Sequence, residues 1–273
     1  MPRGAWAKPE NKRTGMGVMD FCRVEREGRL LIVTMNRPDK LNALIPESHD
    51  EMALIFNEFQ ADGGLDVAIL TGAGRGFCSG SDISAYVAGT NRPLPPEGGG
   101  GITHNSRLTK PVIAAVNGLA MGGGFEIALA CDLMVAAEEA AFALPEPLVG
   151  AAALGGGIFQ LCRKLPYAVA MNLLLTGERL SAVEAHRHGL VNQLAPAGEV
   201  LGAAKALAGK IMRCAPVALQ ATKQMAALAL RAVPPEAAER EEVAARARVM
   251  GSEDFKEGMA AFMERRKPVW SGR

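Results

Sequence analysis

Two glycine clusters carry the residues whose types and spacing are best suited to chemistry. They cover residues 71–80 (TGAGRGFCSG) and residues 117–126 (NGLAMGGGFE), and each follows an apolar run typical of a strand. Because glycine has no Cβ, the backbone N–H groups of such turns can approach a ligand closely. In the second cluster, a helix start adds about half a positive charge, which suits a developing oxyanion. Two N–H donors from separate turns can hold one carbonyl oxygen as it becomes an enolate. The alternative for either cluster alone is close helix–strand packing.

The first cluster does not match a nucleotide-binding loop. A dinucleotide fold would need a final glycine where this sequence has Cys78, and neither Tyr86 nor Tyr167 is followed by a lysine four residues later. The sequence also lacks the G-x-x-x-x-G-K-[ST] pattern that cradles phosphates. A nicotinamide enzyme is therefore disfavoured, and we predict no cofactor.

The elements that must position these turns alternate between strands and helices. Apolar, β-branched runs predict strands over residues 30–35, 65–71, 111–117 and 133–136. Apolar residues at helical spacing predict a helix over 47–60. This alternation predicts an α/β core built from β-α-β units.

The C-terminal third has a different pattern, because strand signals stop past about residue 158. Ser181 and Glu184 have the spacing of a capping box, which opens a short helix that Gly189 should close. Further helices, rich in alanine, are predicted over 197–212, 216–232, 236–250 and 252–265. Their Ala, Leu and Met content favours burial against a partner subunit.

Two segments have little regular pattern. Residues 86–105 include the stretch GTNRPLPPEGGGG and predict a long loop, either a mobile lid or disordered. Residues 1–17 carry four basic groups and almost no apolar pattern, so we predict a disordered N-terminal arm.

Charge and composition exclude several classes of protein. The 273 residues include 30 basic and 29 acidic side chains, so a net charge of +1 gives no field that would attract nucleic acid or an acidic membrane surface. No apolar run approaches the ~20 residues that cross a bilayer. The five cysteines form no C-x-x-C pair, which argues against disulfide or zinc sites and favours a reducing, cytoplasmic location. No metal site is predicted, since His186 and His188 would diverge on a helix.

Several stretches resemble the crotonase (enoyl-CoA hydratase/isomerase) superfamily. They are residues 36–44 (NRPDKLNAL), 74–83 (GRGFCSGSDI), 110–132, 142–146 (FALPE), 175–192 and 252–270. The resemblance covers residues 18–273, with the motifs in the same order. It implies an α/β, ClpP/crotonase-like fold, a spiral of β-β-α units. Residues 18–200 would form the core with the CoA-thioester site, and residues 201–273 a helical region that packs homotrimers, often paired into hexamers.

The resemblance also implies particular residues for an acyl-CoA site. The backbone N–H groups of Ser81 and Gly123 would form the oxyanion hole, in which removing one donor typically costs about 3 kcal/mol of transition-state stabilisation. Coenzyme A, as part of the substrate, and the acyl group would contact residues of the matching motifs: Lys40, Leu41, Ala43, Ser79, Ser81, Asp82, Ile83, Gly122, Gly123, Pro145 and Leu154.

Two glutamates determine which reaction the resemblance implies. Hydratases of the family have one in the G-G-G-x-E turn and another in a following P-E pair, and this sequence has both, as Glu126 and Glu146. Hydration of an α,β-unsaturated thioester needs a base that activates water at C3 and an acid that protonates C2. Two carboxylates whose pKa values are pushed apart can supply both. We assign Glu126 to water activation and Glu146 to proton transfer at C2.

Three alternative functions remain open. Leu154 stands where hydratases usually have the first glycine of a P-G-x-G-G element, which predicts a narrower or altered pocket and leaves open a non-catalytic acyl-CoA-binding protein. An isomerase would need Glu146 alone. Residues 142–146 and the C-terminal ending also resemble carnitinyl-CoA dehydratases (crotonobetainyl-CoA hydratases). A quaternary ammonium substrate should want an aromatic or acidic cage, for which only Tyr86 and phenylalanines near the loop are available.

Overall fold

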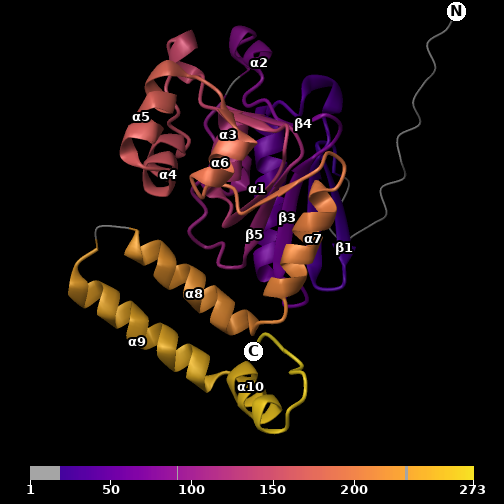
Figure 1. Cartoon of the computed structure of the whole chain (residues 1–273), viewed down its shortest axis with the longest axis vertical. Coiled ribbons are helices and arrows are strands. Elements are labelled where there is room, and N and C mark those ends of the chain that lie inside the picture. The colour runs from indigo at the N-terminus through magenta and orange to yellow at the C-terminus, as the bar shows by residue number, and fades with distance from the viewer. Residues whose placement is uncertain (1–18, 91, 231–232) are drawn as a thin grey trace, which may run out of the picture.

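Two β-sheets form the core of the protein in the computed structural model, which describes residues 19–90, 92–230 and 233–273 (Figure 1). The first sheet contains β1 (Cys22–Glu27), β2 (Leu30–Met35), β3 (Val67–Gly72), β5 (Val112–Val116), β7 (Leu133–Ala137) and β10 (Gln193–Ala195), in that spatial order. The second contains β4 (Gly76–Cys78), β6 (Leu119–Met121), β8 (Ala141–Ala143) and β9 (Leu180–Ser181), again in that order. The β1–β2 and β8–β9 pairs are antiparallel and the other pairs are parallel. The predicted N-terminal arm, residues 1–17, lies outside the described residues.

The helices fall into a group around the sheets and a group at the C-terminus. The first group comprises α1 (Pro46–Ala61), α2 (Ile83–Val87), α3 (Gly123–Ala130), α4 (Gly157–Lys164), α5 (Tyr167–Thr176), α6 (Ala182–Arg187) and α7 (Val200–Ile211). The second comprises α8 (Pro216–Ala229), α9 (Pro235–Gly251) and α10 (Glu253–Met263). The described residues also contain three short 3-10 helices, η1 (Pro38–Lys40), η2 (Gly99–Gly101) and η3 (Glu146–Val149), in loops.

The chain alternates between the two sheets as it proceeds. β3 is followed by β4, β5 by β6, and β7 by β8, so each pair of consecutive strands contributes one strand to either sheet. Helix α3 follows the second of these pairs. This arrangement confirms the α/β spiral that the resemblance implies. It also places the turns after β4 and β6 close together, because those two strands pair in parallel.

The predicted strands match β2, β3, β5 and β7, whereas the six-residue β1 and the shorter strands were not predicted. β2, β3 and β5 are buried along their whole length, which explains their continuous apolar runs. The prediction that strands stop past residue 158 is wrong, since β9 and β10 lie beyond it. Strands of two or three residues are too short to show the alternation on which a sequence prediction depends.

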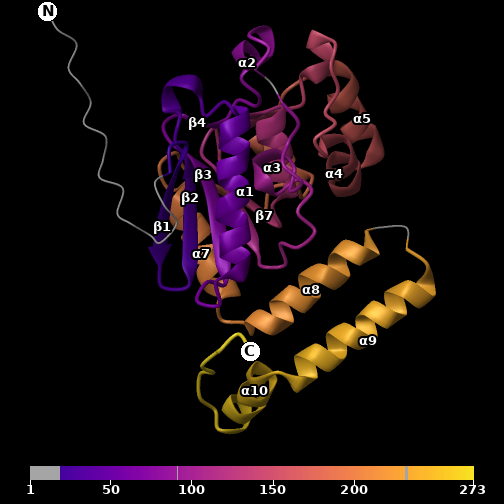
Figure 2. The same ribbon diagram turned by 180° about the vertical axis from the view of Figure 1, so that it is seen from behind.

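Helices α1 and α7 cover opposite faces of the six-stranded sheet (Figures 1 and 2). The buried residues of α7 are Val200, Ala204 and Ala208, which repeat every four residues and so form one face toward β3, β5, β7 and β10. Helix α7 therefore packs on the core. The region predicted to mediate assembly, residues 201–273, thus begins with a helix of the core. The helices that extend from the core are α8, α9 and α10.

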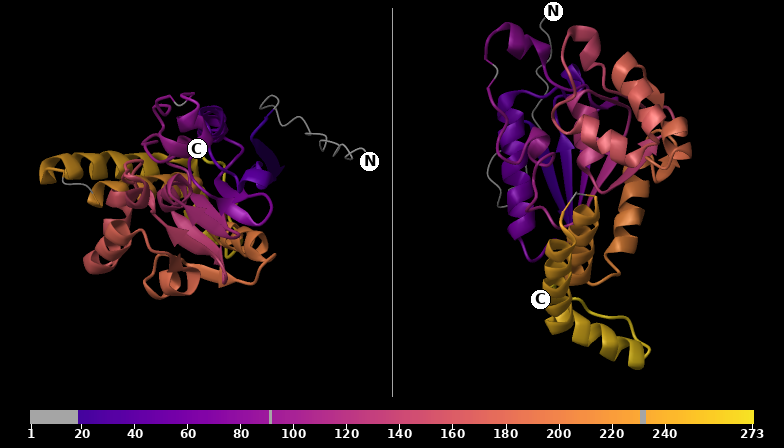
Figure 3. Two further views of the ribbon diagram at one scale, coloured as in Figure 1. Left: turned by 90° about the horizontal axis from the view of Figure 1, so that it is seen from above. Right: turned by 90° about the vertical axis from the view of Figure 1, so that its left-hand side faces the viewer.

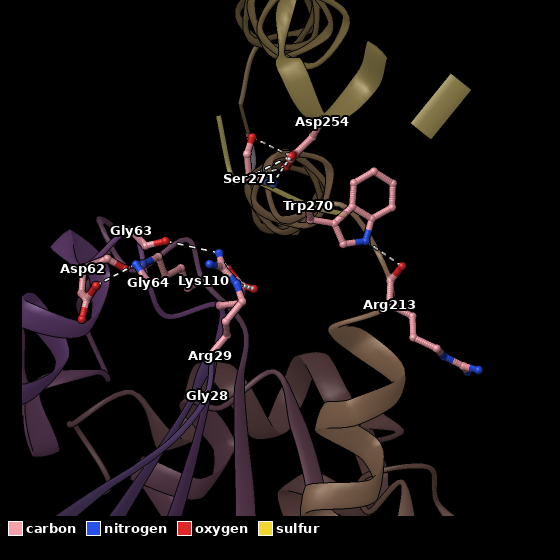
Figure 4. Close-up of polar contacts among 12 residues, drawn as sticks. Gly28, Arg29, Asp62, Gly63, Gly64, Lys110, Arg213, Asp254, Trp270 and Ser271 are labelled. Atoms are coloured by element: carbon pink, nitrogen blue, oxygen red, sulfur yellow. Dashed lines mark hydrogen bonds and ion pairs between the residues drawn. The ribbon is translucent and has the colours of Figure 1, made fainter. Parts of the chain in front are cut away.

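The C-terminal helices extend away from the sheets (Figures 1 and 3). Helices α8 and α9 pack against each other, and the chain end folds back over α10. The Asp254 carboxylate accepts the N–H of Ser271 at 2.7 Å, and Trp270 Nε1 donates to the carbonyl of Arg213 at 2.9 Å (Figure 4). These bonds tie the last residues to α10 and to the segment that precedes α8.

The loop between α2 and β5 is partly packed into the core. The sequence predicts a mobile lid or a disordered loop over residues 86–105. In the structure, the η2 glycines and Ile102 are buried, and η2 packs against α1.

None of the helices in the described ranges combines the length and apolarity that a bilayer crossing requires.

Candidate active site

The turn after β4 presents the backbone N–H of Ser81. Leu44 and Ser81 form a parallel bridge, in which Leu44 N–H donates to the carbonyl of Gly80 and Asp82 N–H donates to the carbonyl of Leu44, both at 2.8 Å. These bonds use the residues on either side of Ser81. The bridge therefore fixes the peptide of Ser81 in place without using its N–H.

The turn after β6 presents the N–H of Gly123, the first residue of α3. The first N–H groups of a helix have no partner within the helix, and the helix dipole favours negative charge there. The preceding Gly122 has φ +51°, in the left-handed region that favours glycine. It lets the chain turn sharply from β6 into α3.

The two turns lie side by side. A Cβ on Gly80 would stand 3.2 Å from the nitrogen of Gly123 and 2.7 Å from the carbonyl oxygen of Met121. A Cβ on Gly123 would stand 3.8 Å from the nitrogen of Ser81. The approach therefore requires glycine at Gly80, which has φ +89°, whereas the distance at Gly123 is an ordinary van der Waals contact. The structure thus brings together the two N–H groups that the sequence predicts as an oxyanion hole.

The segments predicted to hold coenzyme A are joined to the Ser81 turn. Ser79 N–H donates to the carbonyl of Leu41 at 2.9 Å, and Ser79 Oγ donates to the carbonyl of Lys40 at 3.3 Å. Asp82 pairs with Arg37 at 3.1 Å, and Ser84 Oγ donates to Asp82 at 2.6 Å. Hydrogen bonds from Ser84 and from Arg37 lower the pKa of the Asp82 carboxyl. Lys40, Ser81 and Ile83 have exposed side chains, whereas Ala43 is buried.

Asn42 anchors the first of these segments, and the sequence analysis did not single it out. Its side-chain nitrogen donates to the carbonyls of Ala73, Gly76 and Phe77, at 2.9 to 3.1 Å. Asn42 itself has φ +56°, which asparagine tolerates better than most residues. The asparagine between Leu41 and Ala43 in the stretch NRPDKLNAL is the sequence signal that could have revealed this anchor.

Glu126 lies in the first turn of α3, buried with 9% of its surface exposed. Gly157 N–H donates to its Oε1 at 2.9 Å. The carboxylate fits against Gly155 and Gly157 so closely that a Cβ on either glycine would overlap it. Burial raises the pKa of Glu126, and the hydrogen bonds from the Gly157 and Gly155 backbone oppose that rise.

Glu146 begins η3, directly after Pro145, which forms the N-cap of this short helix. Its Oε1 lies 3.1 Å from the position that a Cβ on Gly122 would take. Its Oε2 is buried and has no hydrogen-bond partner among the described residues. Burial raises the pKa of Glu146, and the negative charge of Glu126 raises it further. The fold therefore brings both predicted carboxylates to the helix start that carries Gly123.

Leu154 lies at the edge of this arrangement. Its N–H donates to the carbonyl of Ala152 at 2.8 Å, and its side chain is 77% exposed. The support of Glu126 comes instead from the next residues, Gly155 and Gly157, which the sequence analysis did not assign to the site. The three consecutive glycines at 155–157 were the signal available for them.

The Cys78 thiol, a further reactive group near the site, is buried and hydrogen-bonded. The Cys78 thiol lies beside the Ser81 turn, is fully buried and donates to the carbonyl of Asn42 at 3.2 Å. Burial raises the pKa of Cys78 to about 12, so the thiol is protonated at neutral pH. The described ranges contain no group of three or more His, Cys, Asp or Glu side chains placed to hold a metal ion.

Comparisons with known proteins show which family the chain resembles. A family model described as enoyl-CoA hydratase/isomerase matches residues 25–273. Carnitinyl-CoA dehydratase of Proteus mirabilis is 40% identical over 256 residues, which cover 90% of this chain and 96% of the relative. The protein of that name from Escherichia coli K12 is 41% identical over 255 residues, covering 91% and 97%. A crystal structure of an enoyl-CoA hydratase from Mycobacterium tuberculosis H37Rv has a TM-score of 0.88 and 44% identity, covering 93% of this chain and 99% of that one.

Proposed function

The chain belongs to the enoyl-CoA hydratase/isomerase (crotonase) family, and from this premise we propose that it is a hydro-lyase that adds water to 2-enoyl-CoA thioesters. The product would be the 3-hydroxyacyl-CoA. The observation that carries the proposal is the convergence of two carboxylates with raised pKa values, Glu126 and Glu146, on the helix start of Gly123. An isomerase would need only one of them.

In the proposed mechanism, the N–H groups of Ser81 and Gly123 bind the thioester oxygen and stabilise it as it becomes an enolate oxyanion. Glu126 takes a proton from water, and the resulting hydroxide oxygen forms a bond to C3. The C2–C3 π electrons move toward the carbonyl, and C2 is then protonated by Glu146. Return of the proton from Glu126 to Glu146 completes the cycle, so one water is added and neither carboxyl changes.

Substrate binding would rely on the motifs joined to the oxyanion turn. Lys40, Leu41 and Ala43 on one segment and Ser79, Asp82 and Ile83 on the other are linked by the Ser79 hydrogen bonds described above. We assign coenzyme A to these segments. Gly122, Pro145 and Leu154 would border the acyl group.

The relatives named carnitinyl-CoA dehydratase favour a second candidate substrate, crotonobetainyl-CoA. A trimethylammonium group is best recognised by aromatic faces or carboxylates. The contacts described above for Glu126 and Glu146 are made by glycines and include no aromatic face, so an uncharged acyl group is the first candidate.

The test measures hydration of crotonyl-CoA by the loss of the ultraviolet absorbance of its conjugated thioester, with the product identified by mass. A gain of one water that disappears in Glu126→Gln and in Glu146→Gln would support the proposal. Turnover of crotonobetainyl-CoA alone would favour the second candidate. Movement of a double bond without a gain in mass would indicate an isomerase, and tight binding without turnover a non-catalytic protein.

The C-terminal helices support a proposal about assembly. Five large apolar side chains on α9 and α10 are more than half exposed: Val243, Met250, Met259, Phe262 and Met263. Exposed large apolar side chains on two helices that contact each other favour a protein interface. We assign α8 to α10 to a homotrimer contact, with or without pairing into a hexamer. Light scattering of the purified protein would give a mass of three or six times 28.7 kDa.

A further inference from the structure

His49, near the start of α1, is a buried imidazole that the proposed mechanism does not use. It is 7% exposed, and its Nδ1 accepts the backbone N–H of Gly100 at 2.9 Å. An imidazole nitrogen accepts a hydrogen bond only when it carries no proton. Burial lowers the pKa of His49 to about 4, with Asp50 opposing and Arg92 adding to this shift. The Nδ1 acceptor therefore persists at neutral pH.

The glycine turn that His49 holds lies directly on two helices. Gly100 has φ +57°, and a Cβ there would stand 2.6 Å from Cδ1 of Ile127 on α3. Gly101 has φ +68°, and a Cβ there would overlap the backbone of Ala53 on α1. The turn can occupy this place only as bare backbone, so its position depends on contacts made by its peptide groups.

The loop that contains this turn lies beside Glu126's helix and beside the glycines that support its carboxylate. Ile127, which meets Gly100, is the next residue after Glu126 along α3. A few residues beyond the turn, the carbonyl oxygen of Thr103 lies 3.8 Å from the position that a Cβ on Gly156 would take. Gly156 stands between the two glycines that fit against the Glu126 carboxylate. A shift of the loop would therefore reach Glu126 both through its own helix and through the glycine turn that supports it.

Other side-chain bonds between α1 and this loop are exposed to solvent. Asn57 donates to Glu97 at 2.9 Å, and Asn105 donates to Asn57 at 3.4 Å. In the part of the chain that the structure describes, the His49–Gly100 bond is the buried side-chain bond from α1 to residues 97–105. Because water competes less for a buried bond, it holds the loop more firmly than the exposed ones.

We propose that His49 is a positioning residue for the reaction: its bond to Gly100 fixes residues 98–103 and thereby the Gly155–Gly157 turn that orients the Glu126 carboxylate. This role rests on the proposed hydratase function. His49 itself does not contact the reacting atoms. Its loss should weaken the chemical step, in which Glu126 activates water, more than it weakens binding of the CoA portion, which we assign to residues 40–43 and 79–83.

The test compares His49→Leu with His49→Asn. Leucine fills the site without an acceptor, whereas the asparagine Oδ1 can take the place of Nδ1. Since misplacement of a catalytic group by about 1 Å can cost 10²-fold, we expect His49→Leu to lower kcat about tenfold or more. We expect its KM for crotonyl-CoA to change by less than about threefold, because uniform binding is retained. His49→Asn should recover most of the loss.

Amide hydrogen exchange gives a readout that does not depend on turnover. Peptides covering residues 96–105 should exchange faster in His49→Leu than in the parent and should regain protection in His49→Asn, while peptides of β3 stay unchanged. Should His49→Leu fail to fold, His49→Gln, which moves the acceptor farther along the side chain, replaces it.

Two results would overturn the positioning role. One is parent-like kcat and parent-like protection in His49→Leu; the other is a folded His49→Asn that behaves as His49→Leu does in both assays. If the parent itself does not hydrate enoyl-CoA thioesters, the hydratase proposal fails on that measurement alone. Unchanged exchange in His49→Leu would then still overturn the role of His49.

Discussion

Glu126 and Glu146 carry the same carboxyl group in two differently built regions. Around Glu126, glycine N–H groups approach the carboxylate and Gly157 donates to it at 2.9 Å. Around Glu146, one oxygen lies against Gly122 and the other is buried without a hydrogen-bond partner among the described residues. Buried polar atoms are nearly always satisfied, so an unpartnered one calls for a functional explanation. The fold holds one carboxylate by hydrogen bonds and leaves an oxygen of the other without a described partner, which fits the proton transfer that we propose for Glu146.

The same difference separates the two groups electrostatically. Burial raises the pKa of both carboxyls. Hydrogen bonds from the Gly157 and Gly155 backbone oppose the rise at Glu126, whereas at Glu146 a hydrogen bond from its own backbone opposes the rise and the negative charge of Glu126 adds to it. Repulsion between the two carboxylates favours a pair that holds a single proton, and the proposed mechanism places that proton on Glu146. This distribution agrees with a water-activating base at Glu126 and an acid at Glu146.

The largest expected effect is the loss of hydration when either carboxyl is replaced. Glu126→Gln and Glu146→Gln should each lower kcat for crotonyl-CoA by about 10²–10⁴-fold, the usual contribution of general acid–base catalysis. Affinity for the CoA thioester should stay near that of the parent. The control is Glu139→Gln, because Glu139 has an exposed side chain. Hydration at the parent rate by Glu146→Gln would refute its assigned role.

A proton-exchange experiment would separate the two roles. With 3-hydroxybutyryl-CoA in D₂O, Glu126→Gln should still exchange a C2 proton, because Glu146 and the oxyanion turn remain. Glu146→Gln should lose this exchange together with hydration. Mass spectrometry of the recovered thioester measures the deuterium. If Glu126→Gln lost exchange and Glu146→Gln kept it, the two assignments would have to be reversed.

A smaller effect is expected from disturbing only the support of Glu126. A Cβ at Gly155 would overlap the Glu126 carboxylate, so Gly155→Ala should turn that group and lower kcat about 10- to 100-fold. Gly209→Ala in α7 is the matched control, because a Cβ there meets no atom within 4 Å. Parent-like turnover in Gly155→Ala would show that the orientation of Glu126 does not limit the reaction.

The proposed reacting groups and the residues that support them differ in how far the sequence predicted them. Ser81, Gly123, Glu126 and Glu146 lie in short motifs of glycines and carboxylates, and the structure places them together. The long buried strands were likewise predicted, because their apolar runs reflect burial on both faces. The supports Asn42, Gly157 and His49 were missed. Their partners are 31 to 51 residues distant in sequence, and nothing local in the chain indicates which backbone group each will meet.

The smallest expected effect concerns stability, and it opposes the effect on activity. The folded protein raises the pKa of Glu146 above 4.5, so it binds a proton more readily than the unfolded chain does. Stability from this group is therefore present at low pH and lost as the pH rises through the folded pKa. Replacing the carboxyl by an uncharged amide should make Glu146→Gln more stable than the parent at pH 8, and the gain should disappear below about pH 4. A gain of 1 kcal/mol would raise Tm by about 2–4 °C.

Glu126→Gln should gain less stability at pH 8. Its amide has only one oxygen, so the amide nitrogen can face the N–H of Gly157, and a buried donor without an acceptor costs about 1–3 kcal/mol. Thermal unfolding of the parent and of both variants at pH 4, 6 and 8 measures the difference. Equal gains in the two variants would mean that the glycine N–H groups contribute little to holding Glu126. A loss of stability in Glu146→Gln at pH 8 would mean that the buried, charged Glu146 carboxylate does not destabilise the parent.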